Sequence, residues 1–192
     1  MKVIGITGGI GSGKTTVCKI FELFGVPVFY ADVEAKKLYD DTKIKSKVIK
    51  LFGNKILAKD QTIDKRKLAA IVFNDKPSLE KLNALIHPLV RKKFLDWKKK
   101  HKGVKYVIKE AAIMIESGAN KELDYLISVS SPKSLRLNRI ILRDKVEKLE
   151  VEKRIKEQIP DREREKYSDT IIINDSKHSL IEQVLKIHQH LS

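Results

Sequence analysis

The chain has few of the features that mark disulfide-bonded, membrane-spanning or zinc-binding proteins. Its 192 residues contain one cysteine, Cys18, which excludes a disulfide within the chain and suits a reducing compartment. No run approaches the ~20 consecutive apolar residues that a transmembrane helix needs, so we expect no membrane partner. Cysteine and histidine never occur at zinc-ligand spacing. Because a strand-like segment starts at residue 2, we expect no signal peptide and a cytoplasmic location.

Positive charge is abundant. The chain has 40 lysines and arginines against 25 aspartates and glutamates, a net charge of +15. In the densest basic stretch, residues 91–102, the only aromatic side chains are Phe94 and Trp97, which is unlike an RNA-binding strand. We interpret this stretch first as a solvated helix face, second as a wall for a phosphorylated small substrate and third as a nucleic-acid site. We therefore expect no nucleic-acid partner, and we expect a monomer.

A glycine-rich segment, residues 8–15, follows the strand-like residues 2–7 and fits the P-loop pattern G-x-x-x-x-G-K-[ST]. Its glycines allow positive φ, so that successive backbone N–H groups can form an anion-binding nest. A helix should begin near Gly13 and direct its N-terminus at the same phosphates. Lys14 would reach the β- and γ-phosphates of ATP, and the Thr15 hydroxyl would bind Mg²⁺. The ATP-binding residues expected here are Gly9, Gly11, Ser12, Gly13, Lys14, Thr15 and Thr16.

Short apolar runs alternate with helical patterns along the chain. This alternation is typical of an α/β fold, a parallel sheet with helices on both faces. The runs expected as strands are residues 2–7, 26–30, 104–108, 123–129 and 170–173, and a last helix is expected over about 178–191.

The segment between the second and third runs is longer than one crossover needs. Its helical patterns cover about 31–40, 43–52, 65–74 and 76–101. Pro77 and Pro88 should lie near helix starts, where a missing N–H costs nothing. We expect a helical insertion over 31–103 that binds the phosphate acceptor.

Motifs along the chain, the P-loop segment among them, point to one family. The matching segments are residues 7–17, 31–32, 83–90, 139–144, 154–158 and 168–174. Together they resemble the dephospho-CoA kinase family, whose members transfer the ATP γ-phosphate to the ribose 3′-hydroxyl of dephospho-CoA in the last step of coenzyme A biosynthesis. The resemblance implies one P-loop kinase domain over 1–192, with the insertion as acceptor subdomain and a small helical lid over 132–166. It also implies ATP, Mg²⁺ and dephospho-CoA as ligands.

Asp32 is the candidate general base. It follows the second strand-like run, and if that strand lies parallel beside the first, both strands end at the same edge of the sheet, where ligands bind. A carboxylate there can accept the proton of the attacking hydroxyl. The residues alone leave a role as N-cap of the next helix equally open. The resemblance favours the base.

Three arginines, Arg136, Arg139 and Arg143, are spaced by three and four residues and therefore share one helix face. The resemblance places them in a mobile lid and implies that one or two of them reach the transferring phosphate when the lid closes. We assign this role to Arg139 and Arg143 and rank Arg136 last. The alternatives are a solvated basic face and, for Arg143, a local ion pair with Asp144.

Four further residues are site candidates by resemblance. Asn174 would lie near the adenine, with a turn residue as the alternative. Lys65, Arg66 and His87 would contact the acceptor together with Asp32, although a packing role for His87 also remains open.

Two other functions are compatible with a P-loop. One is a nucleoside or nucleotide kinase, and the other is a nucleic-acid-associated ATPase. A GTPase is excluded, because the sequence has no D-x-x-G and residues 120–124 are one residue out of register with N-K-x-D.

Overall fold

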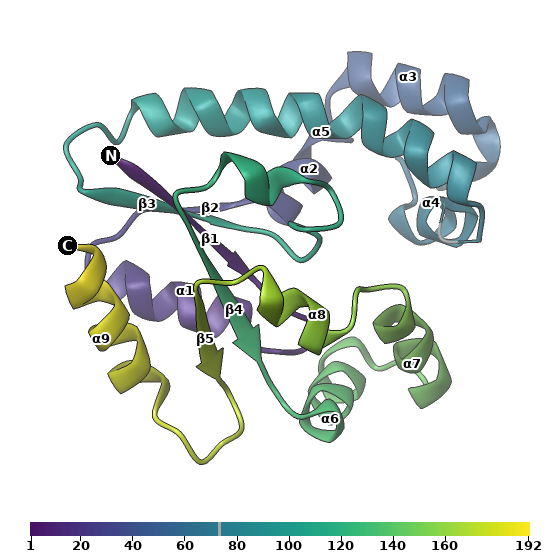
Figure 1. Ribbon diagram of the computed structural model, residues 1–192. Coiled ribbons are helices and arrows are strands. Elements are labelled where there is room, and N and C mark those ends of the chain that lie inside the picture. Colours follow the sequence, from purple (N-terminus) through teal and green to yellow (C-terminus); the bar gives the residue numbers. More distant parts are fainter. Residues whose placement is uncertain (73) are drawn as a thin grey trace. The chain divides into compact units, whose positions relative to one another are not determined.

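The computed structural model describes residues 1–72 and 74–192 and divides the chain into two compact units (Figure 1). The first unit consists of Met1–Tyr30 and Lys100–Ser192, and the second of Ala31–Lys99. Within the described residues, no helix has the length and apolar character needed to cross a membrane.

The first unit is built on a sheet of five strands among the described residues. They are β1 (Lys2–Thr7), β2 (Val28–Tyr30), β3 (Tyr106–Glu110), β4 (Tyr125–Ser130) and β5 (Thr170–Ile173). All pairings are parallel and the order is β2-β3-β1-β4-β5, which confirms the predicted α/β class.

The second strand does not lie beside the first, the condition under which Asp32 was placed at the sheet edge, because β3 lies between them and pairs with both β1 and β2. All five residues of β3 are buried, which suits an inner strand, whereas only the middle one of the three residues of β2 is fully buried, and β2 forms an edge. The carboxyl ends still share one edge of the sheet, since Glu110 pairs with Ile6 on one side and with Tyr30 on the other.

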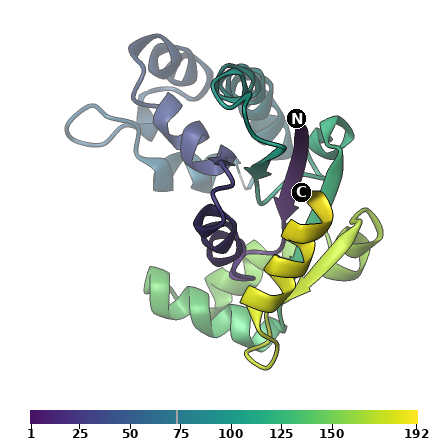
Figure 2. The same cartoon turned by 90° about the vertical axis from the view of Figure 1, so that its left-hand side faces the viewer.

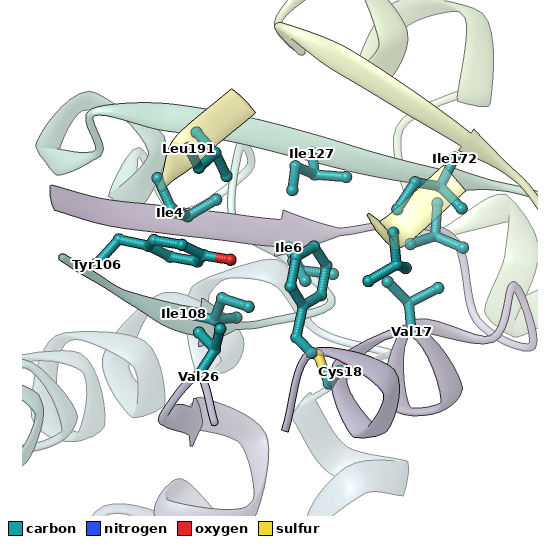
Figure 3. Packing of buried hydrophobic residues seen from close by; sticks show 13 residues of the cluster. Ile4, Ile6, Val17, Cys18, Val26, Tyr106, Ile108, Ile127, Ile172 and Leu191 are labelled. Carbon is teal, nitrogen blue, oxygen red and sulfur yellow. The ribbon is translucent and has the colours of Figure 1, made fainter. Parts of the chain in front are cut away.

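Two helices, α1 (Lys14–Leu23) and α9 (Leu180–Leu191), pack together against one face of the sheet (Figure 1). Figure 2 shows α9 beside β5. Figure 3 shows their apolar side chains meeting those of the strands. The buried cluster includes Ile4, Ile6, Val17, Cys18, Phe21, Ile108, Ile127, Ile172 and Leu191. Cys18 is therefore a packing residue, and the pKa of its thiol is raised by burial and by the nearby Glu110 carboxylate.

The chain between β4 and β5 forms three short helices of the first unit, α6 (Lys133–Asp144), α7 (Lys148–Lys156) and α8 (Asp161–Lys166). Because α6 begins three residues after the end of β4, it starts at the carboxyl edge of the sheet (Figure 1). This is the edge at which open α/β sheets bind ligands.

The second unit is helical. It contains α2 (Ala31–Leu38), α3 (Thr42–Phe52), α4 (Lys65–Val72) and α5 (Lys76–Lys99), with a short 3₁₀ helix at Asn54–Ile56. Residue 73 of the expected 65–74 helix lies outside the described residues. Both α2 and α4 pack against α5.

Pro77 is the second residue of α5, as expected, but Pro88 lies inside the helix and not near its start. An interior proline costs about 3 kcal/mol, because it removes a backbone donor and crowds the preceding turn. Helix α5 continues through Pro88 because its buried apolar face extends on both sides of the proline. Leu82, Ile86, Val90 and Phe94 follow one another at intervals of four residues and are all buried.

Candidate functional site

The P-loop connects β1 to α1 with the geometry that its glycines predict. Gly13 is the N-cap of α1 and has a left-handed backbone with φ 98°, so the helix begins where the sequence placed it. A Cβ at Gly13 would lie 2.1 Å from Nδ2 of Asn174, which leaves room for glycine alone. Because α1 begins directly after the loop, its first backbone N–H groups, which have no partner within the helix, face the loop.

Lys14 and the hydroxyl side chains around it supply polar groups at the loop. Lys14 is buried, and its Nζ donates to Gly8 O at 2.9 Å and Gly9 O at 3.4 Å. The hydroxyls of Thr7 and Ser12 are buried, and among the described residues neither has a hydrogen-bond partner. Buried hydroxyls without partners are costly, and phosphate oxygens would satisfy them.

Asn174 and Arg139 reach the loop from other elements. Nδ2 of Asn174 donates to Ser12 O at 2.7 Å. Arg139 donates from Nη2 to Asn174 Oδ1 at 3.2 Å, and from Nη1 to Ser131 Oγ at 3.2 Å and Gly11 O at 3.5 Å. A chain of hydrogen bonds thus connects α6, the segment after β5 and the P-loop. Thr15 and Thr16 are exposed in the first turn of α1.

Gln158 also contacts the loop, a role that sequence reasoning missed. Its Oε1 accepts a hydrogen bond from the Ile10 backbone N–H at 2.7 Å. The next residue, Ile159, donates its N–H to Glu116 Oε1 at 3.3 Å. Gln158 ends the segment 154–158 that carried part of the family resemblance, so a signal was present but indicated no role.

Arg143 lies apart from this network. It is exposed and donates to Asp144 at 2.7 Å and 3.1 Å, the local ion pair that was the alternative for it. The hydrogen bonds between Arg143 and Asp144 hold the pKa of the Asp144 carboxyl below its ordinary value and raise the pKa of the Arg143 guanidinium. Arg154 also pairs with Asp144, at 3.3 Å. A phosphate contact by Arg143 would therefore require this ion pair to open and the predicted lid, residues 132–166, to move.

The two arginines should give different kinetic losses. Arg139→Ala is expected to lower kcat and raise the KM for ATP, each about tenfold, because Arg139 already contacts the loop. Arg143→Ala is expected to lower kcat about a hundredfold with the KM for ATP unchanged, because it would act only in the closed state. Steady-state kinetics of both variants tests this. If Arg143→Ala leaves both constants unchanged, Arg143 belongs to a solvated face.

The acceptor-site candidates all lie in the second unit. Asp32 is the second residue of α2, so its alternative role as N-cap is wrong, because the helix begins before it. Lys65 and Arg66 are exposed in the first turn of α4, where the Asp64 carboxylate accepts from the Arg66 N–H at 2.9 Å. His87 is half-buried within α5.

Comparison with known proteins gives one consistent result. A family model described as dephospho-CoA kinase matches residues 2–179. A dephospho-CoA kinase of Fusobacterium nucleatum is 43% identical over 174 residues, which is 91% of this chain and 90% of the relative. A dephospho-CoA kinase structure from Campylobacter jejuni matches with a TM-score of 0.69 and 31% identity, over 99% of this chain and 96% of that one. A Thermus thermophilus structure reaches a TM-score of 0.88 at 28% identity, over 98% and 96%.

Proposed function

Because this chain belongs to the dephospho-CoA kinase family, we infer that it transfers the γ-phosphate of ATP to the ribose 3′-hydroxyl of dephospho-CoA, giving CoA and ADP. The observation that carries this function is the family match over residues 2–179, which includes the P-loop. No feature of the described residues favours a nucleoside kinase or a nucleic-acid-associated ATPase over it.

The P-loop acts on the donor. Phosphoryl transfer needs positioning and charge neutralisation more than covalent help from the protein. The N–H groups of the loop and of the first turn of α1 bind the β- and γ-phosphate oxygens, and Lys14 neutralises charge between them. Arg139 and Asn174 hold the loop from Gly11 to Ser12, which supports a role of both residues in ATP binding.

Asp32 is the proposed base. Tyr30 ends β2 at the carboxyl edge of the sheet and pairs there with Glu110. The chain limits the distance from the Tyr30 Cα to the Asp32 Cα to about 7.6 Å, so Asp32 stays close to this edge. Its carboxylate takes the proton of the ribose 3′-hydroxyl as that oxygen bonds to the γ-phosphorus, while the bond between the γ-phosphorus and the departing ADP oxygen breaks.

Mg²⁺ is the proposed cation. The Thr15 hydroxyl is exposed in the first turn of α1, beside the phosphate-binding N–H groups, and oxygen is the ligand that Mg²⁺ prefers. Thr15 would therefore hold the ion together with phosphate oxygens and water. The chemistry the ion supplies is neutralisation of charge on the β- and γ-phosphates.

The second unit is the proposed acceptor subdomain, and residues 132–166 the proposed lid. The unit carries 18 lysines and arginines against 9 aspartates and glutamates, a net +9 of the chain's +15. This excess supports binding of dephospho-CoA, whose pyrophosphate is anionic. We assign Lys65 and Arg66, both exposed, to that anion, and His87 to a further acceptor contact.

We also propose that the enzyme is a cytoplasmic monomer. The Gln183 side chain supports the monomer, because its amide donates to Ile173 O at 2.9 Å and accepts from Ile173 N at 2.8 Å. It thereby occupies backbone groups of the edge strand β5 that a second copy would need for pairing. The free, buried thiol of Cys18 suits the reducing cytoplasm.

A coupled assay of ADP release with ATP, Mg²⁺ and dephospho-CoA tests the function. We expect turnover that depends on dephospho-CoA and yields CoA, with Lys14→Ala as the blank and adenosine and AMP as rival acceptors. Turnover with a rival alone would keep the kinase and reject the acceptor. Absence of turnover with every acceptor would favour the ATPase alternative.

A further inference from the structure

An ion-pair cluster joins α6 to the start of α8. Arg136 is on α6 and Arg164 on α8, and their side chains are only 6% and 1% exposed. Both bind Asp161, the first residue of α8. Arg136 Nη2 lies 3.0 Å from Asp161 Oδ2, and Arg164 Nη1 contacts Asp161 Oδ1. Arg164 Nη2 also donates to Ile159 O at 2.9 Å. The cluster therefore ties α6 to the start of α8 within the proposed lid.

Arg136 contacts the P-loop directly at Gly9. A Cβ at Gly9 would lie 1.8 Å from Nη1 of Arg136 and 3.3 Å from Oδ1 of Asp161. Gly9 is not among the glycines with positive φ, so glycine is needed there for space and not for backbone conformation. The missing side chain lets the guanidinium lie against the loop backbone.

The contact lies at the γ-phosphate end of the loop. Lys14, whose side chain reaches the β- and γ-phosphates in a P-loop, has its Nζ 2.9 Å from Gly8 O and 3.4 Å from Gly9 O. Arg139 contacts the loop further on, at Gly11 O. Two cations, Lys14 and Arg136, therefore converge on Gly9.

The cluster contains more positive than negative charge, since one carboxylate serves two guanidinium groups. Among the described residues, the buried Nε atoms of Arg136 and Arg164 have no hydrogen-bond partner. Burying an excess charge is costly unless an opposite charge comes close. The γ-phosphate of ATP supplies such a charge at this end of the loop.

We propose that Arg136 binds the γ-phosphate of ATP, and that Asp161 and Arg164 are positioning residues that hold its guanidinium against Gly9. The proposal rests on the proposed ATP-dependent function. It assigns to Arg136 a phosphate contact of the kind that the family resemblance implied for its neighbours Arg139 and Arg143 on α6. It also predicts that this site distinguishes ATP from ADP before any acceptor binds.

The test compares nucleotide affinities without acceptor, by calorimetry with ADP and with the β,γ-imido analogue of ATP. Arg136→Lys keeps the charge but loses the forked geometry of the guanidinium. We expect its affinity for the ATP analogue to fall about tenfold, the effect of one charge-assisted hydrogen bond, with ADP affinity within about twofold. Arg162→Lys, an exposed neighbour on α8, is the matched control and should bind both nucleotides as wild type does.

Asp161 variants test the positioning role. Asp161→Asn should lower the affinity for the ATP analogue and leave the affinity for ADP unchanged, whereas Asp161→Glu, which keeps the carboxylate, should bind the analogue as wild type does. Glu163 is exposed on the same helix, and Glu163→Gln should change the affinity for neither nucleotide. Equal losses for ATP and ADP, or none, in a folded Arg136→Lys protein would overturn the inference, with folding checked by circular dichroism. That result leaves the proposed function intact if wild type still makes CoA. Failure of wild type to bind either nucleotide would instead reject the proposed function.

Discussion

Replacing Lys14 by alanine is expected to lower kcat/KM about a thousandfold, because it removes the positive charge that lies between the β- and γ-phosphates in a P-loop. Its Nζ already lies over the start of the loop, bonded to Gly8 O and Gly9 O, so little reorganisation is needed when ATP binds. Most of the loss should appear in kcat, since charge on the transferring group is shared most widely in the transition state. Initial rates of CoA formation at varied ATP give both constants.

The matched control for this prediction is Lys19→Ala. Lys19 is exposed on the same helix, so its removal changes the net charge equally without touching the loop. The control should keep kcat/KM within about twofold, as surface substitutions usually do. If Lys14→Ala retained more than about a tenth of wild-type activity while Lys19→Ala behaved as expected, the loop would not be the donor site.

Local patterns in the sequence predicted much of the first unit, because apolar runs and glycine spacing depend on nearby residues. The order of the strands depends on long-range pairing, which puts β3 between β1 and β2. The end of β3 was also predicted too early, at residue 108. Lys109 and Glu110 continue the strand to its carboxyl end and are buried there, which hydrophobic patterning cannot anticipate for charged residues.

The arginines of α6 show the same limit in the site. Their spacing correctly put Arg136, Arg139 and Arg143 on one helix, but each has a different partner. Arg136 pairs with Asp161, and Arg139 bonds to Asn174. Arg143 bonds to its neighbour Asp144. The first two partners come from other elements of the chain, so spacing could not rank the three arginines. Arg136, which we ranked last, is the one with the closest approach to Gly9.

Asp32→Asn is expected to lower kcat about a thousandfold while the KM for ATP stays within about twofold. A positioned general base contributes roughly 10²–10⁴-fold, and asparagine keeps the shape of the side chain but cannot take a proton at the reaction's pH. The dissociation constant of ATP should be unchanged, because the donor is held by the P-loop. Single-turnover formation of CoA, measured beside equilibrium ATP binding, separates the two effects.

The control for Asp32→Asn is Asp40→Asn, an exposed aspartate of the second unit just beyond the end of α2. It removes the same charge from the same unit and should leave kcat within about twofold. Asp32 lies in the first turn of α2, where a carboxylate also stabilises the helix by about 0.3–1 kcal/mol through the dipole. If Asp32 has only this structural role, Asp32→Asn lowers the unfolding temperature and leaves kcat unchanged. If Asp32 is the base, kcat falls whatever the change in stability, so full turnover by a slightly less stable Asp32→Asn protein would show that the base is another group.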